Sequence, residues 1–326
     1  MSHKKIVLIG GGTGSFALLS SLKNYTKNIT GLVNMADDGG STGILRDELG
    51  VLPPGDVRQC LVALSESSKT RDLFNYRFGE GSFKGHSFGN LFISAMEKMT
   101  NNFSEAVELA SETLRITGQV LPITTEKSEL VMTDTDGKIT KKQFTIGNMD
   151  FAGKKRPNIA LDPPGKILPE ARDAIIDADV VVIAPGNLYG SLAPALVVDG
   201  VGEALAKTKA KVVYVCNLVT KPKQTDDFKV HDYASEIERF IGLPVLDYVI
   251  YNTDNPTQEI LKKYASDDEF IVEVDKKALK KAHYQSIGRD LIDEQPARFD
   301  KNDAIASKRS LIRHNGDEVS KILTTL

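Results

Sequence analysis

The chain has 326 residues, with 41 Lys+Arg against 44 Asp+Glu and a formal net charge of −3. This near balance argues against a dedicated nucleic-acid-binding protein, and the 41% hydrophobic content argues against disorder. The length suits two domains or one large α/β domain. Cys60 and Cys216 lack metal-like spacing, no apolar run is long enough to span a bilayer, and no signal sequence is evident, so we expect a cytoplasmic protein.

Short apolar runs that end in small or polar residues alternate with amphipathic stretches along the chain. Such alternation predicts a mainly parallel sheet with helices on both faces, a doubly wound, Rossmann-like α/β fold in a single domain over residues 1–326. Strands are expected at 6–9, 29–33, 180–184, 212–216, 246–251 and 310–312. Helices are expected at 16–22, 57–65, 91–99, 104–114, 169–177, 194–207 and 233–241, followed by a C-terminal amphipathic helix.

Residues 119–165 interrupt this alternation. Residues 128–133 and 138–146 flank Asp134-Thr135-Asp136-Gly137, which is typical of a β-hairpin with an Asp-Gly turn. Gly118 and Pro163-Pro164-Gly165 bracket the segment. We therefore predict a small β lobe inserted into the sheet domain over residues 119–165.

The first strand ends in a glycine loop, Gly10-Gly11-Gly12-Thr13-Gly14-Ser15, in front of a helix. Ligands of open parallel sheets bind beyond the carboxyl ends of the strands, glycines let a phosphate approach the backbone, and a helix N-terminus favours anions. The alternative explanation for these glycines is a tight turn that needs positive φ angles and binds no ligand. Ser15 at the third glycine position and Asn34 at the end of the second strand depart from the pattern of NAD-binding loops. The candidate nucleotide-binding residues here are Gly11, Gly12, Thr13, Gly14 and Ser15.

The second strand ends in a longer polar loop, Asn34-Met35-Ala36-Asp37-Asp38-Gly39-Gly40-Ser41-Thr42-Gly43, followed by Arg46. Adjacent carboxylates are costly unless they meet a cation or hydrogen-bond donors. One of them binds Mg²⁺, or both cap turns; the residues leave these alternatives open. The glycines also resemble a backbone nest for anions. The nucleotide-binding candidates of this loop are Asn34, Asp38, Gly39, Gly40 and Ser41.

A third loop, Gly85-His86-Ser87-Phe88-Gly89-Asn90, precedes an apolar helix. His86 suits proton donation or phosphate binding, whereas the alternative is a helix cap made by Ser87 or Asn90. The candidates from this loop are His86, Ser87 and Asn90.

The second half of the sheet supplies a fourth junction, Pro185-Gly186-Asn187-Leu188-Tyr189-Gly190-Ser191, which would face the first glycine loop across a crevice. Asn217 follows another strand on the same edge, and Arg313 could contact a phosphate, although a solvated pair with His314 is the alternative. The candidates are Gly186, Asn187, Leu188, Tyr189, Asn217 and Arg313. The sequence shows no Cys/His metal spacing, Walker A loop or Ser-His-Asp arrangement.

The order and spacing of these four loops resemble the CofD-like (YvcK/CofD) family along most of the chain, and within it the bacterial gluconeogenesis-factor branch. The resemblance implies a Rossmann-like fold that is often dimeric. In one branch it implies transfer of 2-phospholactate from a nucleotide donor to a deazaflavin, with Mg²⁺ aided by an acid that would be Asp38 here, or Asp37 as second choice. The other branch is linked to growth on gluconeogenic carbon sources, to cell shape and to nucleotide sugars of the UDP-N-acetylglucosamine type.

Met35-Ala36 stands where the transferase pattern has Thr-Gly. We therefore expect a regulatory protein that binds a nucleotide or nucleotide sugar and a protein partner, with no assigned catalytic residue and no nucleic-acid ligand; a homodimer is implied by the resemblance. The alternative is a Mg²⁺-dependent 2-phospholactate transferase-like enzyme with Asp38 as metal ligand and His86 as acid or base. A nicotinamide-dependent oxidoreductase is disfavoured by Ser15 and Asn34.

Overall fold

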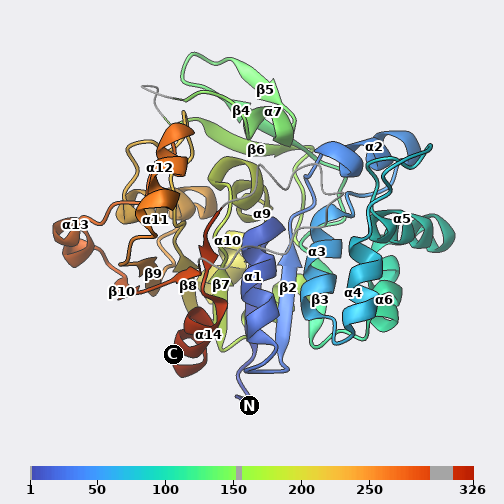
Figure 1. The fold of residues 1–326 in the computed structure, drawn as a ribbon, viewed down its shortest axis with the longest axis horizontal. Helices are drawn as coiled ribbons and strands as arrows, with labels where there is room; N and C mark the ends of the chain where they lie inside the picture. The colour runs from blue at the N-terminus through green and yellow to red at the C-terminus, as the bar shows by residue number, and fades with distance from the viewer. Residues whose placement is uncertain (1, 152–155, 294–310) are drawn as a thin grey trace.

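The protein is described by a computed structural model that covers residues 2–151, 156–293 and 311–326. Its centre is a parallel sheet of seven strands in the order β10-β9-β8-β7-β1-β2-β3 (Figure 1). The strand order reverses between β1 and β7, which is the switch point of a doubly wound fold. The strands are β1 Ile6–Gly10, β2 Ile29–Val33, β3 Gln119–Pro122, β7 Val180–Ile183, β8 Lys211–Val215, β9 Tyr248–Asn252 and β10 Gln285–Arg289.

The continuous apolar runs of the central strands follow from burial on both faces of the sheet. In β1, Val7 and Ile9 point into one hydrophobic core, whereas Ile6 and Leu8 point into the other. Because every position of β1 is buried, no polar alternation remains in its sequence. β1 pairs with both β2 and β7, so it holds the two halves of the sheet together.

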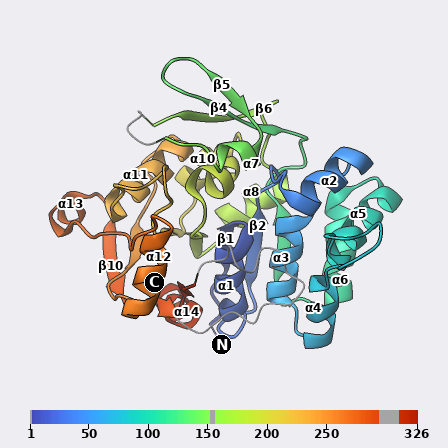
Figure 2. The same cartoon turned by 45° about the horizontal axis from the view of Figure 1, so that its top comes forward.

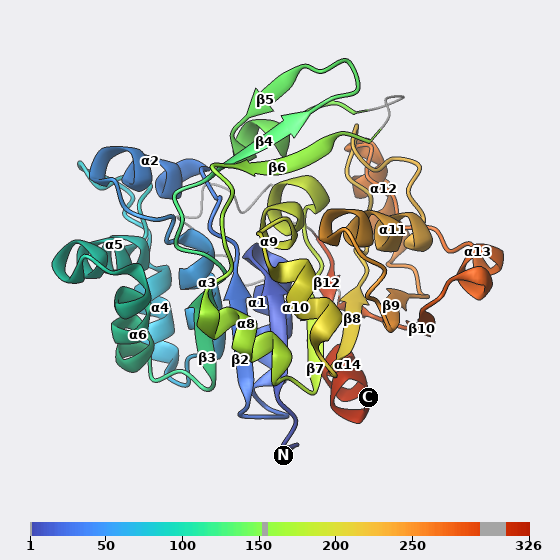
Figure 3. The same ribbon diagram turned by 180° about the vertical axis from the view of Figure 1, so that it is seen from behind.

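Helices cover both faces of the sheet, as predicted (Figures 1 and 3). One face carries α1 Gly12–Leu22, α3 Gly55–Leu64 and α14 Gly316–Thr325; the other carries α8 Pro169–Ile176, α9 Ala193–Leu196, α10 Val201–Lys207 and α11 Val230–Ile241. The remaining α-helices outside the inserted lobe are α2 Gly40–Leu49, α4 Ser68–Asn75, α5 Phe88–Thr100, α6 Phe103–Leu114, α12 Gln258–Ser266 and α13 Lys276–Lys281. None of the helices in the described ranges is long and apolar enough to cross a bilayer.

The inserted lobe is a separate three-stranded antiparallel sheet, β5-β4-β6, that lies beyond the carboxyl ends of the main strands (Figure 2). It consists of β4 Glu129–Thr133, β5 Ile139–Lys141, α7 Gln143–Ile146 and β6 Asn158–Asp162. The predicted hairpin is present, because Thr133 pairs with Ile139 and Gly137 takes a φ of 79° in the turn. Residues 119–122 form β3 of the main sheet, so the lobe begins after them.

Three predicted elements differ from the structure. The second arm of the hairpin, expected at 138–146, is a strand only over Ile139–Lys141, and Gln143–Ile146 form the helix α7. The helix expected at 194–207 is divided into α9 and α10, because Gly200 adopts a φ of 92° between them. A π-helix, η1 Leu188–Leu192, precedes α9 within residues that were expected to form a loop. The strand expected at 310–312 was wrong for residues 311–312, and residue 310 lies outside the described ranges. The Ile312 N–H donates to the Tyr264 hydroxyl at 3.0 Å instead of a strand partner. The strand β12 Arg313–His314 follows, antiparallel to β11 Ile292–Asp293.

Candidate functional site

The glycine loop at the end of β1 is packed so closely that side chains are excluded. A Cβ on Gly14 would lie 2.0 Å from the Pro185 carbonyl oxygen, and one on Gly11 would lie 2.1 Å from Asp56 Oδ2. Gly12 adopts a φ of 66°, which glycine tolerates best. The N-cap of α1, Gly11, has no side-chain hydrogen bond, and the first turn of α1 contains no acidic residue. This helix end therefore presents its positive dipole to the crevice between β1 and β7.

A cavity of about 120 Å³ opens at this point. It lies between the first turns of α1, the loop after β7 and the chain around β12, so it brings together the first and fourth predicted loops with Arg313. Its lining residues are Thr13, Gly14, Ala17, Pro185, Gly186, Asn217, Leu218, Val219, Ile312, Arg313 and His314.

Asn217 holds in place the backbone that forms one wall of this cavity. Its Nδ2 donates to the Gly186 carbonyl at 2.8 Å, and its Oδ1 accepts from the Gly186 N–H at 3.4 Å and from the Tyr214 hydroxyl at 3.1 Å. Behind it, His314 Nε2 donates to the Cys216 carbonyl at 2.9 Å. Burial lowers the pKa of His314 to about 4, so its imidazole is neutral at physiological pH. Asn217 therefore positions the Pro185-Gly186 backbone.

Two acids lie beside the glycine loop, and only one of them was singled out from the sequence. Asp56, in the first turn of α3, accepts a hydrogen bond from the Gly12 N–H. Asp37 Oδ2 lies 3.0 Å from the position of a Cβ on Gly55, which places it next to Asp56. Burial, followed by the charge of Asp37, raises the pKa of Asp56 to about 7. Burial also raises the pKa of Asp37, against hydrogen bonds from Gly39 and Thr42.

This pair fits a divalent cation. Mg²⁺ uses one or two carboxylates together with phosphate oxygens and water, and a cation would relieve the repulsion that raises these pKa values. Within the described residues no group of three or more His, Cys, Asp or Glu side chains could hold a metal ion, so a cation here would depend on ligand oxygens. The pair would contribute the two protein carboxylates.

Asp38, the acid expected to aid Mg²⁺, makes different contacts. Its Oδ1 accepts from the Phe144 N–H of α7 at 2.7 Å, and its Oδ2 lies 3.9 Å from Arg46. Its side chain is only 3% exposed. Asp38 thus links the polar loop before α2 to the inserted lobe, and its role as a metal ligand stays a prediction.

The polar loop before α2 and the loop before α5 meet as a second cluster. Ser41 Oγ is hydrogen-bonded to His86 Nδ1 at 2.9 Å and accepts from Asn90 Nδ2 at 3.4 Å. Arg58 Nε, from α3, donates to Asn90 Oδ1 at 2.9 Å. Ser87 caps α5 by accepting from the Asn90 N–H at 3.3 Å, as the structural alternative predicted. Ser41, His86 and Asn90 are therefore brought together, whereas the side chain of Ser87 caps the helix α5.

Two further candidates are buried near the sheet edge, Asn34 directly after β2 and Ser15 in the first turn of α1. Asn34 Oδ1 accepts from the Ala36 N–H at 3.0 Å, but its Nδ2 has no partner among the residues that the structure describes. In the same part of the chain Ser15 Oγ is also unpaired, close under Gly10. A buried unpaired donor costs about 1–3 kcal/mol, so both groups favour a hydrogen-bonding ligand or water.

Of the residues after β7, some lie at the crevice and others are buried in the hydrophobic core. Asn187 caps η1, accepting from the Gly190 N–H at 3.1 Å, and its Nδ2 donates to the Gly147 carbonyl at 3.4 Å. The side chains of Leu188 and Tyr189 are buried in the core, where the Tyr189 ring lies 4.9 Å from that of Phe151. These two side chains are not brought to the cavity.

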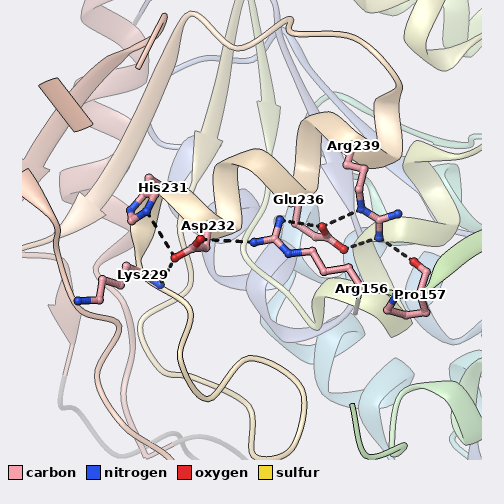
Figure 4. A network of polar contacts seen from close by, with 7 residues as sticks. All are labelled: Arg156, Pro157, Lys229, His231, Asp232, Glu236 and Arg239. Carbon is pink, nitrogen blue, oxygen red and sulfur yellow. Dashed lines mark hydrogen bonds and ion pairs between the residues drawn. The ribbon is translucent and has the colours of Figure 1, made fainter. Parts of the chain in front are cut away.

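The Tyr189 hydroxyl donates to Glu236, which belongs to a buried ionic network (Figure 4). Glu236 is fully buried in α11, with Arg156 at 3.2 Å and Arg239 Nε at 2.8 Å from its Oε2. Arg239 also donates to the Pro157 carbonyl at 2.8 Å, and Arg156 reaches Asp232 at 3.4 Å. The network holds η1, α11 and the chain entering β6 in one arrangement.

Asp56 and Arg58 were missed by the motif analysis. Their signal was the presence of two charged residues in a stretch, Gly55–Leu64, whose other positions are mostly apolar. Both are buried, at 9% and 7% exposure. A charged residue on an apolar helix is a candidate for a site at the helix end.

Comparison with known proteins identifies the family of the chain. Residues 6–292 match the family described as 2-phospho-L-lactate transferase CofD. The chain is 36% identical to the gluconeogenesis factor of Bacillus subtilis, over 99% of this chain and 98% of that protein. It is also 36% identical to the gluconeogenesis factor of Halalkalibacterium halodurans, over 99% and 96% of the two chains.

A solved structure extends the likeness to three dimensions. The crystal structure of a UPF0052-family protein from Bacillus halodurans superimposes with a TM-score of 0.90 at 36% identity, covering 99% of each chain. The family resemblance drawn from the four loops is confirmed. The chain belongs to the CofD/UPF0052 family, among relatives named gluconeogenesis factor.

Proposed function

We propose that this chain is a regulatory protein that binds a nucleotide sugar of the UDP-N-acetylglucosamine type, with the phosphates at the glycine loop. The observation that carries the proposal is the packing of Gly11 and Gly14 at the switch point, where a Cβ would come within 2.1 Å and 2.0 Å of neighbouring atoms. Thr13 and Gly14, in the first turn of α1, line the cavity, so the N-terminus of this helix faces it. Backbone N–H groups at such a helix end recognise phosphate oxygens.

The cavity suits the anionic part of such a ligand. A volume of about 120 Å³ corresponds to about four water molecules, which is enough for a phosphate group but not for a base and sugar. Arg313 lines it and supplies a cation. The base and sugar would extend from the cavity beneath the inserted lobe.

Regulation would pass through the loop from Asp37 to Gly43. Asp38 in this loop binds the Phe144 N–H of the lobe, and the Phe144 side chain is 62% exposed. A ligand that displaces the loop would therefore alter an exposed surface, which a protein partner or a second copy could recognise. In the cell we expect this signal to support growth and cell shape on gluconeogenic carbon sources.

Isothermal titration with UDP-N-acetylglucosamine, UDP-glucose, GDP and NAD, with and without Mg²⁺, tests the proposal. We expect Mg²⁺-independent binding of a UDP-sugar that is recovered unaltered. Arg313→Gln should weaken binding about tenfold or more, since a charge-assisted contact is lost. The matched control is Arg289→Gln, an exposed arginine at the end of β10. Failure of every UDP-sugar to bind would contradict the proposal.

A second function is favoured by one observation, the adjacent carboxylates of Asp37 and Asp56. Asp37 and Asp56 would hold Mg²⁺, which would stabilise the negative charge that develops when an acceptor hydroxyl attacks the phosphorus of a nucleotide-linked donor and a nucleoside monophosphate leaves. Mg²⁺-dependent release of a nucleoside monophosphate would support it. Turnover that survives Asp56→Asn would show that this pair takes no part.

A further inference from the structure

Lys221 lies where the inserted lobe meets the loops that follow β7 and β8. It follows β8, and its Nζ donates to the Gly147 carbonyl at the end of α7. The same carbonyl accepts from Asn187 Nδ2, which belongs to the loop after β7. Gln224, three residues further on, donates to the Ile146 and Met149 carbonyls at 3.1 and 3.0 Å. The ammonium group of Lys221 is thus held between α7 of the inserted lobe and the loops that follow β7 and β8.

The charge of this ammonium group is poorly compensated. Lys221 is partly buried, and burial lowers its pKa, with the Glu269 carboxylate acting in the opposite direction. None of the carboxylates in the described residues comes within 4.0 Å of Nζ, since Lys221 forms no ion pair there. An ammonium group has three donors, and the Gly147 carbonyl uses one. A partly desolvated cation without an anion is costly, so this position favours an anionic ligand.

We propose that Lys221, on the side of the inserted lobe, binds a second anionic group of the ligand, while the cavity at the glycine loop holds the first. The inference rests on the proposed nucleotide-sugar function and names its ligand class more closely, as a diphosphate compound whose negative charge extends past Asn187 toward the lobe. A neutral nucleoside would gain no binding affinity from the charge of Lys221. A diphosphate would replace the missing counter-ion and satisfy the remaining donors.

A purely structural role is the competing explanation. Gly147 is the C-cap of α7, and lysines near helix ends bind the last carbonyl groups. That role needs one donor and no charge. Replacement by glutamine keeps an N–H donor for Gly147 and removes the charge, whereas replacement by arginine keeps the charge. The two explanations therefore predict different ligand affinities for Lys221→Gln.

The experiment measures the binding of uridine, UMP, UDP and UDP-N-acetylglucosamine by titration calorimetry at low and high salt. We expect Lys221→Gln to weaken UDP and the UDP-sugar about tenfold or more, to leave uridine unchanged, and to flatten the salt dependence. Lys221→Arg should bind within about threefold of the natural protein. Lys223→Met, an exposed lysine of the same loop, is the matched control and should change nothing.

The outcomes separate this inference from the proposed function. If the natural protein binds the UDP-sugar and Lys221→Gln binds it equally well, Lys221 is a cap of α7 and the inference is overturned. If no uridine compound binds, the proposed function fails, and inorganic diphosphate becomes the probe. Binding of diphosphate that is lost in Lys221→Gln would still support the anion site, and absence of diphosphate binding would overturn it. Thermal unfolding of each variant checks that the lobe remains folded.

Discussion

Replacing Asp56 by asparagine should make the protein more stable at alkaline pH. The natural side chain ionises at about 7 instead of 3.8, because it is buried beside the charge of Asp37. Asparagine has almost the same shape and still accepts the hydrogen bond from Gly12, but it never carries a charge. Above neutral pH the variant therefore escapes the cost of a buried carboxylate.

The sign and size follow from proton linkage. Between pH 3.8 and about 7 the folded state binds more protons at Asp56 than the unfolded state, so stability falls as the pH rises through this window. At about 1.4 kcal/mol per pH unit, the total loss is about 4 kcal/mol at pH 8 and about half of that at pH 5.5. Asp56→Asn should gain these amounts relative to the natural chain, with little gain below pH 4.

Urea unfolding followed by circular dichroism at pH 4, 5.5 and 8 measures the free energy of unfolding directly. Asp72→Asn, an exposed residue of α4, is the control and should differ from the natural protein by less than about 0.5 kcal/mol at each pH. A gain for Asp56→Asn that does not grow with pH would refute the reasoning. It would mean that the folded protein compensates this carboxylate fully.

Three further predictions concern the surroundings of the site. Gly14→Ala should cost at least about 3 kcal/mol of stability in thermal unfolding, because its Cβ would meet the Pro185 carbonyl at 2.0 Å, whereas Gly79→Ala, with open space around it, should be neutral. Glu236→Gln should lose about 3–5 kcal/mol, since two arginines would be left without their buried carboxylate, while Glu259→Gln in an exposed pair should leave the midpoint unchanged; equal midpoints would show that the network is not stabilising. Asp38→Ala should speed hydrogen exchange at the Phe144 amide but not at Lys142, whose N–H donates to Leu130; unchanged exchange at Phe144 would mean that other contacts hold α7.

The fold was predictable because its strands are buried on both faces. β1 and β7 are continuous apolar runs that end in glycine or proline, so both their position and their parallel pairing follow from the sequence. β10 escaped prediction, since Ser286 and Gly288 interrupt its apolar pattern at the sheet edge. η1 escaped because its residues were assigned to the loop after β7, and a single π-helical turn has no periodicity that marks it in a sequence.

The candidate site was predictable only where its residues stand at strand ends. The glycine loop and Asn217 meet at one cavity, because parallel strands bring their carboxyl ends to the same edge. Arg313 joins them from β12, which is antiparallel to β11 and lies outside the main sheet. Asp56 reaches the site from the first turn of the helix α3. Its location does not follow from spacing along the chain, since it depends on how α3 packs against the end of the sheet.

The pairing of β1 with β7 has a consequence for biosynthesis. Ile6 lies beside Val180, so the first strand of the chain must find a partner that the ribosome makes much later. Until β7 has emerged, β1 has only one neighbour and the glycine loop faces no opposite wall. Such a distant pairing forms late in folding. A nascent chain that stops before residue 180 therefore has no crevice, and ligand capture reports that synthesis of both halves is complete.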